Sequence, residues 1–120
     1  MVFTDAGRTE IRNWLAGTTA TAPSKMLWGT TSETSSVTDT QMTGLVHADS
    51  FVNVDTSVSK QVEYEGIVLS TEATGSSIRQ IGIGTETTGT AGTIYIKEDI
   101  SPITKTDQFD LQTFIIAEVE

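Results

Sequence analysis

The strongest constraint on the fold of this chain is an alternation of apolar and polar side chains near its C-terminal end. Every second position from 109 to 119 carries an apolar residue or threonine. Successive side chains of a β-strand point to opposite faces of the sheet, so the pattern predicts a strand with one face on a core. Phe114 and Ile116 lie on the other face and predict cover on both sides in the second half of this strand.

Shorter β-like segments predict partners for that strand. They lie at 25–29, 51–54, 58–69, 78–83 and 93–97, and the last two form a hairpin across a Thr/Gly turn at 85–92. Gly66 lies inside one of these segments, which predicts a bulge or bend there. We therefore predict a mainly β fold, in which residues 1–120 form a single antiparallel β-sandwich, jelly-roll-like, with one short helix.

The helix is expected within residues 1–17. Thr4 or Asp5 can cap its start, and Gly17 stands where a left-handed stop is favourable. An apolar stripe at i, i+3 and i+4 consists of Ile11, Trp14 and Leu15. The stripe predicts a small helix packed on a sheet or on a neighbouring subunit, with Trp14 in the core.

Residues 30–40 form the least apolar segment of the chain. Eight of these eleven residues are Thr or Ser, which predicts a long surface loop. Long loops in compact domains are often functional. We expect this loop to become ordered on a partner through Thr34, Ser35, Asp39 and Thr40, while the helix stripe supplies the second contact.

Composition excludes several classes of protein. Sixteen Asp and Glu against seven Lys and Arg give a net charge of −9, which would repel a nucleic-acid backbone. No apolar run approaches the length of a membrane span, so we expect no membrane partner. The absence of cysteine excludes disulfides and thiolate chemistry. Four lysines beside 22 threonines are typical of an acidic protein kept in solution at high salt, so a halophilic host is one hypothesis.

Catalytic residues are scarce. His47 is the single histidine and is interpreted as a structural or surface residue. Glu63 and Glu65 project from the same face of one strand, which predicts a solvated acidic face. We predict that the chain is not an enzyme, and that it has no cofactor and no metal site.

Four short motifs appear in a characteristic order. They are TDAG (4–7), MLWG (26–29) followed after the loop by DTQM (39–42), IRQIGI (78–83) and ISPITK (100–105). This order resembles that of tail-fibre and tail-collar-type structural proteins of tailed bacterial or archaeal viruses. One position departs from the pattern, because the residue before Ile81 is usually acidic in those proteins and is Gln80 here.

The resemblance implies a structural role in the virion, on the tail more than on the head. The expected partners are copies of the chain itself, in a trimer or higher ring, and other virion proteins, with contact to the host surface also open. Such assembly would cover the exposed sheet edges. Alternative functions are a head decoration or turret protein, a receptor- or glycan-binding module and, least favoured, an enzyme of polysaccharide chemistry.

Overall fold

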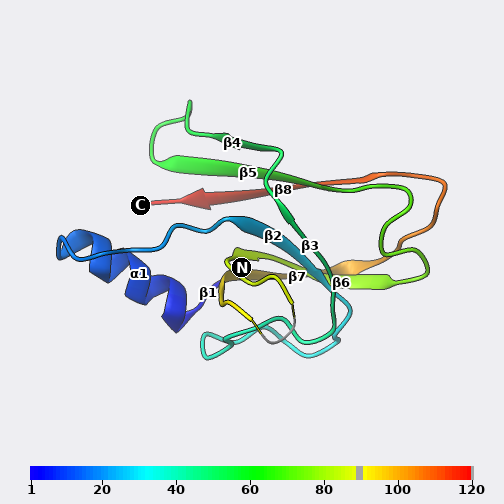
Figure 1. Ribbon diagram of the computed structural model, residues 1–120, viewed down its shortest axis with the longest axis horizontal. Helices are drawn as coiled ribbons and strands as arrows, with labels where there is room; N and C mark the ends of the chain where they lie inside the picture. The colour runs from blue at the N-terminus through cyan, green and yellow to red at the C-terminus, as the bar shows by residue number, and fades with distance from the viewer. Residues whose placement is uncertain (89–90, 120) are drawn as a thin grey trace.

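A computed structural model describes residues 1–88 and 91–119 (Figure 1). The elements in chain order are β1 (Val2–Phe3), α1 (Asp5–Leu15), β2 (Lys25–Gly29), β3 (Leu45–Ser50), β4 (Asn53–Asp55), β5 (Gln61–Val68), β6 (Ser77–Gly84), β7 (Ile94–Thr104) and β8 (Leu111–Glu118). Residues 89 and 90 of the predicted 85–92 turn lie outside the described residues.

The strands form two sheets in which all pairs are antiparallel. Sheet A has the order β1-β7-β6-β2-β3, and sheet B has the order β4-β5-β8. Figure 1 shows the two sheets stacked, with α1 beside one end of the stack. The predicted mainly β antiparallel sandwich with one short N-terminal helix is confirmed.

The main core lies between the sheets and centres on Trp28, which is fully buried. The Trp28 Nε1–H donates to Thr113 Oγ1 at 3.1 Å, and this bond joins β2 of sheet A to β8 of sheet B. A Cβ on Gly66 would approach Met26 Sδ to 2.6 Å and Trp28 Cη2 to 3.0 Å. The predicted bulge at Gly66 is wrong, because β5 pairs with β8 without a break; glycine is required there by the close approach of the sheets.

A second apolar cluster covers the other face of sheet A. Leu27, Met42 and Ile94 are fully or almost fully buried there, under the segment that leads from β2 to β3. Sheet A is therefore covered on both faces, which explains why the run from Lys25 to Gly29 is apolar at successive positions.

Several strand assignments differ from those predicted. Strand β1 was not predicted, β4 begins at Asn53 and not at Phe51, and β8 begins at Leu111 and not at Phe109. Strand β3 at Leu45–Ser50 was not predicted, and its residues pair with β2. Strand β7 runs on to Thr104 through Pro102. Proline is tolerated there because β1 pairs only with Ile96 and Lys97, which leaves the later part of β7 at the sheet edge. Strand β5 begins at Gln61, so Val58 lies outside it.

Among the described residues, no helix is both long enough and apolar enough to cross a lipid bilayer.

Candidate functional site

Helix α1 is fixed to sheet A by its first turn. Thr4 caps the helix, since its Oγ1 accepts a hydrogen bond from the Gly7 N–H at 3.1 Å and donates to the Ile94 carbonyl oxygen at 2.8 Å. Gly7 lies against β7, where a Cβ would approach the Tyr95 carbonyl oxygen to 2.7 Å. The helix ends as predicted, with Gly17 in the left-handed conformation at φ 72°.

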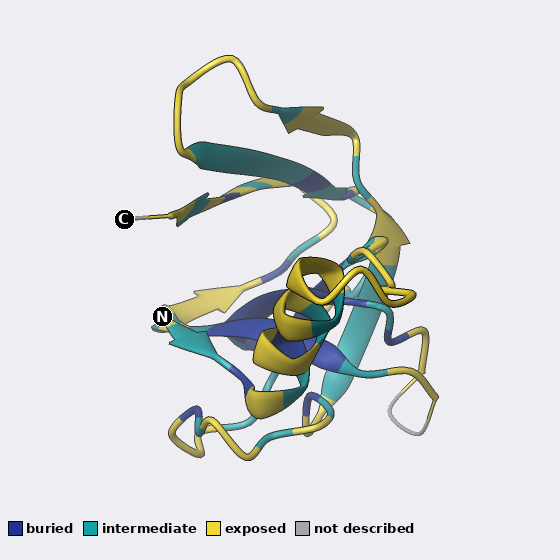
Figure 2. Ribbon diagram, turned by 90° about the vertical axis from the view of Figure 1, so that its left-hand side faces the viewer, coloured by how far each residue is buried: buried dark blue, intermediate teal, exposed yellow. Residues whose placement is uncertain are grey.

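The apolar stripe of the helix remains uncovered. Trp14 is 71% exposed, Leu15 is 72% exposed and Ile11 is 46% exposed. The prediction that the stripe packs on the sheet and that Trp14 belongs to the core is wrong, because these side chains remain exposed. Packing of the stripe on a neighbouring subunit stays a prediction. Figure 2 shows the helix, mostly coloured as exposed, in front of the strands of sheet A.

An apolar groove of about 360 Å³ lies beside this stripe. Helix α1, residues 20–23 and the ends of both sheets enclose it, with a lining that includes Ile11, Trp14, Tyr64, Tyr95, Ala117 and Val119. Glu10 is the charged residue in the lining, and its Oε2 accepts a hydrogen bond from the Thr21 N–H at 2.7 Å. This bond holds the segment after the helix in place and so fixes one wall of the groove.

The outer face of sheet B carries a smaller apolar patch. Phe114 and Ile116 are exposed and lie opposite Glu65 and Glu63 on the neighbouring strand. The described part of the chain provides none of the cover that was predicted for these two residues. The two glutamates lie on this same face, as predicted, and Glu65 Oε1 accepts a hydrogen bond from Gln112 Nε2.

Loop 30–40 is anchored to the outer face of sheet A by polar contacts. The Ser35 N–H and Oγ–H donate to the Asp99 carboxylate at 3.1 and 2.7 Å, and Gln80 Nε2 donates to the same carboxylate at 2.7 Å. Asp39 pairs with the buried Lys97 at 3.0 Å. Desolvation acts to raise the pKa of Asp99, but the bonds from Ser35 and Gln80, together with the charge of Lys97, lower it below its usual value.

These contacts change the expectation for the loop. Ser35 and Asp39 are bound by the chain's own sheet, so the loop is ordered without a partner. Thr34 and Thr40 are exposed, and their role in assembly stays a prediction. Gln80 donates to Asp99 and to the Glu33 carbonyl oxygen and thus secures the loop.

Glu86 is a buried anchor that the sequence analysis did not single out. It is fully buried, and both of its carboxylate oxygens accept from the Met42 N–H, at 3.0 and 3.3 Å. Desolvation raises the pKa of Glu86, against the opposing effects of this bond and of Lys97. An alternating strand pattern ends before Glu86, so no local signal in the sequence marks it as buried.

Neither a family model, nor a curated protein, nor a solved structure matches this chain. The described residues bring together one set of potential metal ligands, His47, Asp49 and Glu72. This set lies apart from the groove, whose lining is almost wholly apolar and suits contact between proteins more than chemistry.

Proposed function

We propose that this chain is a non-enzymatic structural subunit of a tailed-virus particle, placed on the tail, and that it assembles into a closed ring of identical copies. The observation that carries the proposal is the apolar groove with an uncovered helix stripe on its rim. The proposed placement in the virion rests on the order of the four motifs, and the proposed assembly rests on this surface.

The occupant of the groove is a second copy of the chain. One surface provides both a protruding side chain, Trp14, and an apolar recess that leads to Val119. When Trp14 of one copy enters the groove of the next, each subunit donates once and receives once. A twofold pair satisfies both contacts at once, and copies related by a smaller closing rotation form a ring.

Rough magnitudes favour a ring over a simple pair. Full burial of a large apolar side chain contributes about 1.5–3 kcal/mol. The exposed parts of Ile11, Trp14, Leu15 and Val119 together provide on the order of 5–8 kcal/mol per interface, whereas association costs about 4–15 kcal/mol. One interface is therefore marginal, and ring closure adds an interface without another full association cost.

The net charge of −9 makes this assembly dependent on salt. Acidic copies repel one another, and at about 1 M salt the screening length falls to about 3 Å. We expect a ring at molar salt and dissociation in dilute buffer, which light scattering measures in both conditions.

The variant Trp14→Ala tests the groove contact. It removes the protruding side chain, so we expect monomers at molar salt. The matched control is Val58→Ser, an exposed apolar residue outside the groove, and it should leave the ring intact. A wild-type chain that is monomeric in both buffers contradicts the assembly proposal.

Placement in the particle needs a separate measurement. Docking this sandwich into the density of an intact virion should locate a ring on the tail. Density on the capsid surface would instead support the head-decoration alternative, and the absence of the chain from purified particles would contradict a virion role.

A further inference from the structure

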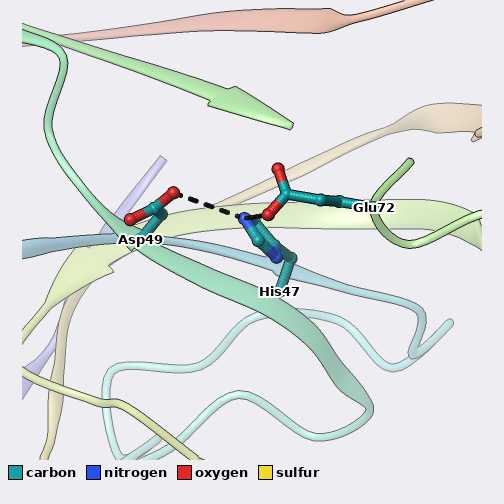
Figure 3. A group of neighbouring side chains, drawn as sticks. All are labelled: His47, Asp49 and Glu72. Atoms are coloured by element: carbon teal, nitrogen blue, oxygen red, sulfur yellow. Dashed lines mark ion pairs between the residues drawn. The ribbon is translucent and has the colours of Figure 1, made fainter. Parts of the chain in front are cut away.

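His47, Asp49 and Glu72 converge at the edge of sheet A (Figure 3). His47 and Asp49 are two residues apart on edge strand β3 and so share one face, while Glu72 comes from the segment between β5 and β6. His47 Nε2 lies 3.7 Å from Asp49 Oδ2 and 3.4 Å from Glu72 Oε2. The three atoms all lie within 4.8 Å of one another.

Each carboxylate is oriented by a backbone donor. Asp49 Oδ1 accepts from the Ser50 N–H at 2.8 Å, and Glu72 Oε1 accepts from the Leu69 N–H at 2.8 Å. These bonds occupy one oxygen of each carboxylate and turn the other toward His47 Nε2. Backbone or side-chain partners that hold ligands in this way are typical of metal sites.

The imidazole Nε2 at the centre of the group is buried and has no hydrogen-bond partner among the residues that the structure describes. The His47 side chain is 15% exposed, and its ring packs against Trp28 with the centroids 5.4 Å apart. A buried nitrogen without a partner is costly, and an unprotonated Nε2 in this place would direct its lone pair at two carboxylates, which repel it. A cation among the three atoms would remove both costs.

We propose that His47 Nε2, Asp49 Oδ2 and Glu72 Oε2 bind one divalent transition-metal ion of the Zn²⁺ class. One imidazole and two carboxylates match the ligands of Zn²⁺, which binds nitrogen and oxygen at about 2.0–2.2 Å. Imidazole disfavours Ca²⁺ and Mg²⁺, which prefer oxygen. Three protein ligands leave a coordination position for water or for a group from a neighbouring molecule.

The ion would link strand β3 of sheet A to the segment that follows β5 of sheet B. Strand β3 is the outer strand of sheet A, and Glu72 belongs to the segment that leaves β5 of sheet B. A bound ion would tie this edge to that segment and would stabilise the folded chain, because it binds the native arrangement and not the unfolded one.

Titration of the full chain with ZnCl₂ at about 1 M NaCl tests the site, since this salt concentration screens diffuse binding to the acidic surface. We expect calorimetry to give one ion per chain. We expect Tm to rise on the order of 10 °C when free Zn²⁺ exceeds its Kd a hundredfold. His47 is the single histidine, so its imidazole NMR signals report Nε2 coordination without ambiguity.

The variants Glu72→Gln and Asp49→Asn separate ligation from folding. Each retains the carbonyl oxygen that accepts the backbone hydrogen bond and removes the charge. Each should weaken Zn²⁺ binding at least about tenfold. Glu63→Gln, on the outer face of sheet B, should leave Zn²⁺ binding unchanged. Unshifted imidazole signals, or weak binding that all three variants leave unaltered, would overturn the proposal and leave His47 as an ion-pair partner.

Discussion

The two sheets of the sandwich differ in what covers them. In Figure 2 the buried residues gather in sheet A, while sheet B and α1 are largely intermediate or exposed. The core lies on one face of sheet A, and the chain's own loop, held by Ser35 and Asp39, covers the other. Sheet B has the core on one face and leaves Phe114 exposed on the other. Sheet A therefore contributes most to the stability of the fold, whereas sheet B and the helix provide the apolar surfaces that are free to contact other molecules.

The two tryptophans give the sharpest form of this comparison. Trp28→Ala should lower the free energy of unfolding by about 3–5 kcal/mol, because it leaves a cavity between the sheets and removes the bond to Thr113. Trp14→Ala should change the monomer's free energy of unfolding by no more than about 0.5 kcal/mol. Urea denaturation in dilute buffer measures both. Equal losses would show that the helix stripe belongs to the core after all.

Gly66→Ala tests how closely the sheets approach each other. The new methyl group would lie within 3.0 Å of Met26 and Trp28 atoms, and overpacking of this kind costs about 1–3 kcal/mol. The double variant Gly66→Ala/Met26→Ala should lose less than the sum of the two single losses, since the shortened side chain makes room. Additive losses would mean that the methyl group is accommodated elsewhere. Unfolding curves of the four proteins provide the comparison.

Local sequence patterns predicted the strands and helix ends whose conformation depends on residues close by in the chain. The period of two identified β8 and most of β5, and Thr4 and Gly17 marked the two ends of the helix. The apolar run at Lys25–Gly29 predicted a strand, and the structure confirms it. In each case the physical cause lies within a few residues of the signal.

The remaining features depend on residues far apart in the chain. Strand β3 lacks a clear alternation of apolar and polar residues, because the polar residues His47 and Asp49 lie on the same face as the core. Pairing with β2 decides its conformation. The stripe that contains Trp14 predicted burial, but whether a sheet reaches it is a tertiary property. The Ser35–Asp99 contact spans 64 positions, so composition alone suggested a free loop. Glu72 likewise joins His47 only through the fold.

The anchors of loop 30–40 give the smallest effect, and its size depends on pH. Asp99→Asn should cost about 1 kcal/mol at pH 7, a value that allows for solvent exposure. The pKa of Asp99 is lowered in the folded chain, so its contribution is present above its unfolded pKa of 3.8 and is lost as pH falls through the folded pKa. The difference between the variant and the wild-type chain should therefore shrink in urea titrations below pH 3.8.

Glu86→Gln is the matched control, because it should show the opposite trend. Burial raises the pKa of Glu86, so ionisation of the carboxylate opposes folding, and stability is lost as pH rises from 4.5 through the folded pKa. Glutamine keeps an acceptor for the Met42 N–H but carries no charge. The free energy of unfolding of the variant should therefore rise relative to that of the wild-type chain as pH rises. Parallel pH profiles for the two variants would show that the charges of Asp99 and Glu86 do not set the stability of the covered face of sheet A.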